Sequence, residues 1–136
     1  MASEASYNKI LHIYNLLKIT NGLFFIIAGA DKFLNMIAEW KIYVGPLVLQ
    51  YIEYSPLITG VGILEIALGL LILSPLTRLG AYLSALWVAV IIVNFLVMGM
   101  YYDIAARDAL IVVGLLALGM ITELKDTVRV SGGRSH

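Results

Sequence analysis

Long uninterrupted apolar stretches are the feature of this sequence that most restricts its fold. A helix that crosses a membrane needs about 20 apolar residues, because the hydrocarbon core is about 30 Å thick and each helical residue rises about 1.5 Å. Four stretches meet this requirement, and they run over residues 10–30, 57–73, 79–100 and 104–122. Backbone groups in lipid must be satisfied within the chain, and these stretches lack the alternation of barrel strands. The sequence therefore predicts an all-α integral membrane bundle of four transmembrane helices.

The overall composition agrees with a membrane environment. Hydrophobic residues make up 61% of the 136 residues and charged residues 13%, whereas a soluble domain carries about 25% charged residues. A soluble chain of this length could not bury so much apolar surface. The net charge is zero, which gives no sign of nucleic-acid binding. We expect a multi-pass protein of the cell (inner or plasma) membrane, surrounded by lipid.

The polar breaks define the expected organisation of the chain. A single transmembrane domain is expected over residues 10–124, after a polar segment over 1–9 and before a flexible tail over 125–136. The connection over 31–56 has apolar residues at helical spacing on both sides of Gly45. We expect short helices at the membrane surface there, with a loop folded back into the mouth of the bundle as the alternative. The aromatic residues expected at headgroup level are Trp40, Tyr43, Tyr51 and Tyr54.

The distribution of Lys and Arg predicts the orientation, since basic residues near helix ends favour the cytoplasmic side. The side that holds both termini and the turn over residues 74–78 has more of these residues than the opposite side. Both termini are therefore predicted to be cytoplasmic. The basic residues are Lys9, Arg78, Lys125, Arg129 and Arg134 on the first side, and Lys32, Lys41 and Arg107 on the other.

The absence of certain residue types from the sequence disfavours several kinds of chemistry. A chain without cysteine forms no disulfide, iron–sulfur cluster or thiol redox centre of its own. The histidines are His12, near a helix end, and His136, in the tail, which excludes a bis-histidine haem. No metal-ligand pair at helical spacing includes a histidine, and no nucleophile or phosphate-loop motif is present. We expect no catalytic residue, no metal and no covalently held cofactor, and not an independent enzyme; a quinone or a lipid could still bind.

Ionisable residues inside the apolar stretches are the candidate functional residues. Glu65 lies near the middle of its stretch, where a charge costs about 3 kcal/mol, so it should face the bundle interior as a structural hydrogen-bonding group or as a proton or ligand site. We expect Arg107 within hydrogen-bonding reach of Glu65, directly or through a water. One excess negative charge predicts a protonated carboxyl group, with Glu65 the best candidate. The expected polar cluster is Asp31, Lys32, Glu65, Asn94, Asp103, Arg107 and Asp108.

Other residues have weaker roles in this interpretation. Asp103 and Arg107 have the spacing and order that favour an ion pair on a helix, with charges reaching to the membrane surface as the alternative. Lys18 and Asn21 form a secondary polar stripe, in which Lys18 should reach to the headgroups and Asn21 could hydrogen-bond Glu65. Small residues should form helix-packing faces. They are Gly60, Gly62, Ala81, Ser84, Ala85, Ala89, Gly114 and Ala117.

Several short motifs occur in a fixed order along the chain. They are Gly29-x-x-Lys32, Glu65-x-x-x-Gly69, Arg78-x-Gly80 and Tyr102-Asp103-Ile104-Ala105-x-Arg107-Asp108. In this order the chain resembles the DoxX-like family of small membrane proteins over residues 18–122. The resemblance implies a four-helix membrane fold and a link to respiratory or sulfur redox systems, since one branch of the family is the small subunit of a thiosulfate–quinone oxidoreductase.

This resemblance leads to the first functional expectation, which is an accessory or anchoring subunit of a quinone-linked redox system with a partner subunit. The residues themselves leave two alternatives open. One is a binding or transport protein that uses the charged cluster for a small molecule or a proton. The other is a membrane assembly or scaffold protein that uses its small-residue faces to bind partner helices or further copies of itself.

Overall fold

The computed structural model describes residues 3–133, and all the regular elements within that range are helices. They are α1 (Glu4–Leu34), the 3-10 helix η1 (Trp40–Tyr43), α2 (Pro46–Leu49), α3 (Tyr54–Leu73), α4 (Thr77–Met98) and α5 (Tyr102–Gly133). Four of them, α1, α3, α4 and α5, are long and apolar enough to cross a membrane. The predicted all-α bundle is therefore confirmed, and the chain is a multi-pass membrane protein.

The first and last helices extend beyond the apolar stretches from which they were predicted. Ser3 caps α1, because its side chain accepts a hydrogen bond of 3.1 Å from the N–H of Ser6. The expected polar segment over residues 1–9 is thus helical from Glu4 onward. The expected flexible tail is wrong over residues 125–133, which continue α5, whereas 134–136 lie outside the described residues. Hydropathy marks only the part of a helix that lipid covers, so it gives no signal for these polar turns.

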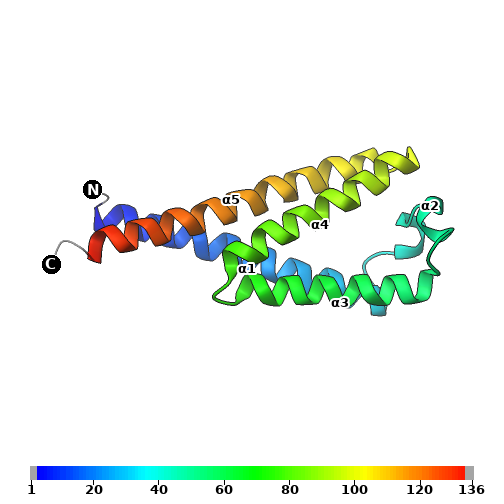
Figure 1. The fold of residues 1–136 in the computed structure, drawn as a ribbon, viewed down its shortest axis with the longest axis horizontal. Coiled ribbons are helices and arrows are strands. Elements are labelled where there is room, and N and C mark those ends of the chain that lie inside the picture. Colours follow the sequence, from blue (N-terminus) through cyan, green and yellow to red (C-terminus); the bar gives the residue numbers. More distant parts are fainter. Residues whose placement is uncertain (1–2, 134–136) are drawn as a thin grey trace.

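The four long helices form two antiparallel pairs (Figure 1). Helix α1 packs along α3, and α4 packs along α5. The pairs diverge toward the end where the connection between α1 and α3 lies, and both chain termini lie at the opposite end. We call these the loop end and the terminal end.

The α1–α3 pair is held by four glycines that we call the glycine seam: Gly22, Gly29, Gly62 and Gly69. A Cβ atom at Gly29 would lie 2.7 Å from the carbonyl oxygen of Gly62, and one at Gly69 would lie 2.7 Å from the carbonyl oxygen of Gly22. Real Cβ atoms essentially never come so close to backbone, so a larger residue at either position would force the two helices to shift. The seam lets the two backbones touch directly, which is how membrane helices gain dispersion contacts that lipid cannot supply.

The other expected packing residues divide into two groups. On α4, Ala81, Ser84 and Ala85 are buried as predicted. The expected packing role is wrong for Gly60 and Gly114, since a Cβ atom at either would have no neighbour within 4 Å. Small size alone does not reveal which side of a helix faces its neighbour. The remaining residues of the set behave in the same mixed way: Gly62 is in the seam, Ala89 is half-buried and Ala117 is exposed.

The connection between α1 and α3 forms the two short expected helices, η1 and α2. It lies across the loop end between the α1–α3 and α4–α5 pairs (Figure 1), which favours the alternative of a loop folded back over the bundle mouth. Trp40 and Tyr43 accordingly face the bundle, where they contact Lys32 and Phe95, and their rings pack edge-to-face with centroids 6.2 Å apart. Tyr51 is 83% exposed, and its position at headgroup level stays a prediction.

Candidate functional site

A buried ion pair joins α1 to α3. The Nζ atom of Lys32 lies 2.5 Å from Oε2 of Glu65, and both side chains are 5% exposed. Lys32 stands near the C-terminal end of α1, where a side chain leans back toward the N-terminus of its helix. Its ammonium group therefore runs into the bundle, 3.4 Å from the carbonyl oxygen of Ala28, and not outward to the membrane surface.

Two tryptophans complete the surroundings of this pair. The indole N–H of Trp87, on α4, donates a hydrogen bond of 3.2 Å to the second carboxylate oxygen of Glu65. The ring of Trp40, on η1, covers the ammonium group of Lys32, with its centroid 3.7 Å from Nζ. Such a cation–π contact stabilises a lysine that has lost its water. Four helices thus contribute to one charged centre, which we call the Lys32–Glu65 centre.

Asp31 builds the turn that brings Trp40 into place. One of its oxygens accepts the backbone N–H groups of Met36 and Ile37 at 2.8 and 2.9 Å. The other accepts the N–H of Ala38 at 3.1 Å and the indole N–H of Trp40 at 2.8 Å. Asp31 is 3% exposed, and these four donors replace the water that its carboxylate loses. The expected cluster member Asp31 therefore shapes the connection.

Asn94 fastens the same connection to α4. Its amide nitrogen donates to the carbonyl oxygen of Tyr43 at 2.8 Å, and its amide oxygen accepts the N–H of Gly45 at 3.1 Å. The ring of Tyr43 also packs edge-on against Phe95 and Tyr101, with centroids 6.1 and 5.1 Å away. Asn94 thus holds the loop across the bundle mouth, and the structure gives it no contact with Glu65.

Asp108, on α5, is the remaining buried carboxylate near the pair. Its side chain is 12% exposed and lies within electrostatic range of Lys32 and Glu65. The nearest cation is its neighbour Arg107, whose Nε atom is 3.9 Å away on a side chain that is 69% exposed. Asp108 accepts no hydrogen bond from any residue in the range 3–133. It is therefore the least compensated of the buried carboxylates.

The expected direct contact between Glu65 and Arg107 is wrong, because the carboxylate of Glu65 contacts Lys32 and Trp87, and the side chain of Arg107 is 69% exposed. Successive residues of a helix point about 100° apart, so Asp108 faces inward and Arg107 faces outward. The expected pair between Asp103 and Arg107 is also wrong, because the ion pair that the structure gives to Arg107 is the one with Asp108.

The secondary stripe separates from the Lys32–Glu65 centre. Asn21 donates a hydrogen bond of 2.8 Å to the carbonyl oxygen of Leu17 in its own helix, so the expected bond to Glu65 is wrong. Lys18 donates to the hydroxyl group of Tyr14 at 3.3 Å and belongs to a cluster nearer the terminal end.

The sequence analysis missed Trp40 and Trp87 as members of the site. A signal was present for Trp87, since a buried indole N–H needs an acceptor, and Glu65 is the acidic residue in the middle of an apolar stretch. For Trp40 the signal was ambiguous, because interfacial tryptophans are common at headgroup level.

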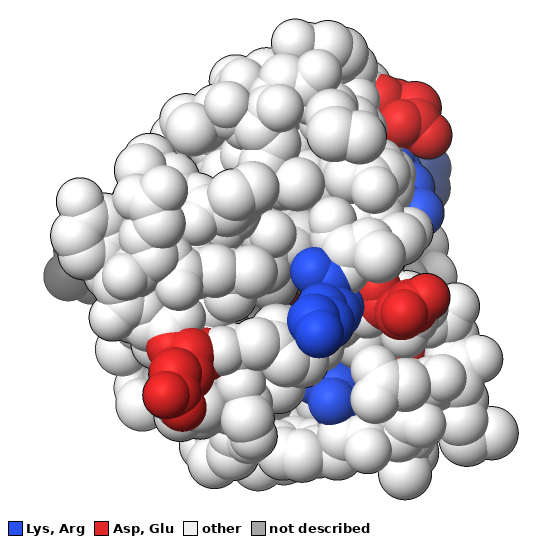
Figure 2. Space-filling model, turned by 90° about the vertical axis from the view of Figure 1, so that its right-hand side faces the viewer, with Lys and Arg blue, Asp and Glu red and all other residues white. Residues whose placement is uncertain are grey.

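The exposed surface at the loop end is mostly uncharged (Figure 2). Basic atoms gather near the middle of this face, with acidic atoms close by. A groove beside this end runs between the connection and α4, and its one polar side-chain lining, Asn94, already uses its amide on the loop. The lining residues of the groove are Gly45, Pro46, Leu47, Val48, Val90, Val93, Asn94, Val97 and Met98.

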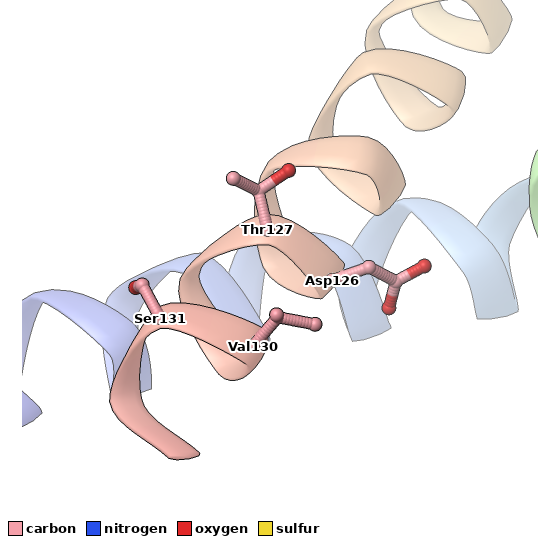
Figure 3. A pocket seen from close by; sticks show the side chains of 4 residues that line it. All are labelled: Asp126, Thr127, Val130 and Ser131. Carbon is pink, nitrogen blue, oxygen red and sulfur yellow. The ribbon is translucent and has the colours of Figure 1, made fainter. Parts of the chain in front are cut away.

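A second depression lies far from the charged centre, along the last turns of α5 (Figure 3). It is lined by Asp126, Thr127, Val130 and Ser131, whose side chains lie on different sides of the helix and do not converge on one point. Across residues 3–133, no three His, Asp or Glu side chains gather as metal ligands would.

Comparison of the chain with protein-family models, with curated proteins and with solved structures gives no match. The resemblance to the DoxX-like family therefore stays a prediction from the motifs, and so do the redox association and the partner subunit that it implies. What the structure adds is the charged centre itself, on which a functional proposal can rest.

Proposed function

We propose that the protein transfers protons within the membrane, and that Asp108 is the group that binds and releases them. The supporting observation is the unequal compensation of three buried carboxylates. Glu65 has the ammonium group of Lys32, and Asp31 has four N–H donors. Asp108 has only an exposed arginine at 3.9 Å. A largely buried carboxylate whose partner is distant and exposed is costly, and binding a proton removes that cost.

The Lys32–Glu65 centre gives Asp108 a second relevant neighbour. Lys32 is a single cation within electrostatic range of two carboxylates, those of Glu65 and Asp108. Lys32 can neutralise one of the two, and the exposed Arg107 at 3.9 Å compensates the other only weakly, so a proton would stabilise that second carboxylate. The geometry favours Asp108 for the proton, in place of the sequence-based choice of Glu65, because Glu65 already has the short contact to Lys32.

The bundle interior contains polar groups toward the terminal end that could pass a proton on. Ser84 is fully buried, and its hydroxyl group has no hydrogen-bond partner in the described chain. It lies one helical turn from Trp87, which contacts Glu65. Farther along, the hydroxyl groups of Tyr14 and Thr77 lie 3.1 Å apart and are both buried. These groups would need bridging waters between them.

Proton transfer is testable in vesicles loaded with a pH-sensitive dye and driven by a potassium diffusion potential. We expect the wild-type protein to admit protons and Asp108→Asn to reduce the rate to that of protein-free vesicles, because the amide cannot exchange a proton. Asp103→Asn is the matched control, since Asp103 is exposed on the same helix and should leave the rate unchanged. Equal rates for wild type and Asp108→Asn would refute the proposal.

We also propose that the loop end faces outward and both termini face the cytoplasm, on the distribution of Lys and Arg. The chain has no cysteine, so single cysteines can be introduced without background. In intact cells, Gln50→Cys should react with an impermeant maleimide, because Gln50 is exposed in the connection. Thr127→Cys, which is exposed on the last turns of α5, should react only after the cells are opened. The reverse pattern would show the opposite orientation.

An accessory role in a quinone-linked redox system is supported by the motif resemblance alone. An assembly or scaffold role likewise stays a prediction.

A further inference from the structure

Two lysines from different helices converge on one tyrosine toward the terminal end. The Nζ atom of Lys18, on α1, lies 3.3 Å from the hydroxyl group of Tyr14, and that of Lys125, on α5, lies 4.3 Å from the centre of its ring. Tyr14 is itself fixed, since it is 7% exposed and its hydroxyl group lies 3.1 Å from Oγ1 of Thr77. The ammonium groups are thus held on a rigid aromatic base between α1 and α5.

This cluster lies at the level of a membrane surface. Thr77 is the first residue of α4, directly after the short turn from α3, and such a turn between two membrane-spanning helices marks the boundary of the bilayer. The hydrogen bond between Tyr14 and Thr77 places Tyr14 at that level. Figure 1 shows α1 and α5 continuing together beyond the turn toward the two termini. Lys18 and Lys125 therefore lie where lipid phosphates lie.

The local charges leave an excess of positive charge. Arg78 and Glu123 neutralise each other at 2.9 Å. Lys125 has a partner in Asp126 at 3.3 Å, but that carboxylate is 61% exposed, and water screens it. Lys18 has one hydrogen bond, to Tyr14, for its three donors. The cluster thus has one net positive charge and unused N–H donors, which suits a singly charged phosphodiester.

We propose that Lys18 and Lys125 together bind the phosphate group of an anionic membrane lipid, with Tyr14 as the base of the site. The headgroup lies between α1 and α5, and its acyl chains extend along the apolar surface of the helices toward the loop end. This site is separate from Asp108, so it does not depend on the proposed proton transfer.

The proposal predicts a lipid-specific gain in thermal stability for the purified full chain in mild detergent. Phosphatidylglycerol should raise the unfolding temperature, phosphatidylcholine should not, and inorganic phosphate tests whether a free anion suffices. Each lysine near an anionic lipid surface contributes about fivefold in affinity. Lys18→Gln and Lys125→Gln should therefore each raise about fivefold the phosphatidylglycerol concentration needed for a given rise in unfolding temperature, and Lys125→Arg should leave that concentration unchanged.

Lys41→Gln is the matched control, since Lys41 is an exposed lysine at the loop end, and it should leave the lipid effect unchanged. The comparison uses the lipid-induced shift of each variant, so a general loss of stability does not imitate the result. An equal shift with inorganic phosphate would overturn the lipid as ligand and assign the site to a free phosphate. An equal loss in Lys41→Gln, or no difference between the two lipids, would overturn the site.

Discussion

Replacing Lys32 with methionine is expected to destabilise the protein by about 3–5 kcal/mol, the typical result of removing one partner of a buried ion pair. The substitution leaves the buried carboxylate of Glu65 with the indole N–H of Trp87 as its remaining partner. It also removes the cation that Trp40 covers. The measurement is unfolding in mixed detergent micelles, compared with the wild-type protein.

The double variant Lys32→Met, Glu65→Leu is the informative control. It removes both charges, and replacing a buried pair by apolar residues of similar size is often neutral or stabilising. We therefore expect it to recover most of the stability that the single variant loses. Lys41→Met, at an exposed lysine, should have little effect. A single Lys32→Met variant as stable as the wild type would show that the pair does not form.

Gly29→Ala is the second substitution for which we expect a large effect, a loss of about 1–3 kcal/mol from overpacking. The new Cβ atom would lie 2.7 Å from the carbonyl oxygen of Gly62 and 2.9 Å from the backbone nitrogen of Ile66. Backbone atoms cannot rotate away as a side chain can, so α1 and α3 must separate. Because α3 positions Glu65, the separation should also weaken the contact with Lys32.

Gly60→Ala and Gly114→Ala are matched controls for this prediction. Both replace a helical glycine, and at both positions the added Cβ atom would have no neighbour within 4 Å. Since alanine favours a helix by about 1 kcal/mol over glycine, these variants should be as stable as the wild type or slightly more stable. If Gly29→Ala behaved like them, the direct backbone contact of the glycine seam would be refuted.

The long helices could be predicted from the sequence because lipid leaves the chain few alternatives. Their ends could not, since the turns beyond the bilayer are stabilised by local features such as the Ser3 cap and not by hydropathy. The path of the connection was beyond prediction for a different reason. It depends on Asp31 collecting donors from residues 36–40 after Asn35 takes a left-handed conformation with φ 50°.

The burial of Glu65 at the candidate site could be predicted from the sequence, and the contacts of the site could not. Burial of Glu65 and its proximity to other charges followed from the cost of a charge in lipid. Its pairing with Lys32 could not be predicted, because Lys32 lies at the end of its helix in the sequence, and a lysine at a helix end usually reaches outward to the membrane surface. Arg107 and Asp108 are neighbours, and which of them faces the bundle interior depends on how α5 is rotated about its own axis. The apolar residues around that end of the helix do not reveal this rotation.

The state of Asp108 decides the functional account, and infrared spectroscopy measures it directly through the carbonyl stretch of protonated carboxyl groups. At neutral pH we expect one buried protonated carboxyl group in the wild type and none in Asp108→Asn. Lys32→Met should show two, because Glu65 then also lacks a cation. A wild-type protein with no such group, or a band that survives in Asp108→Asn, would contradict the assignment of the proton to Asp108.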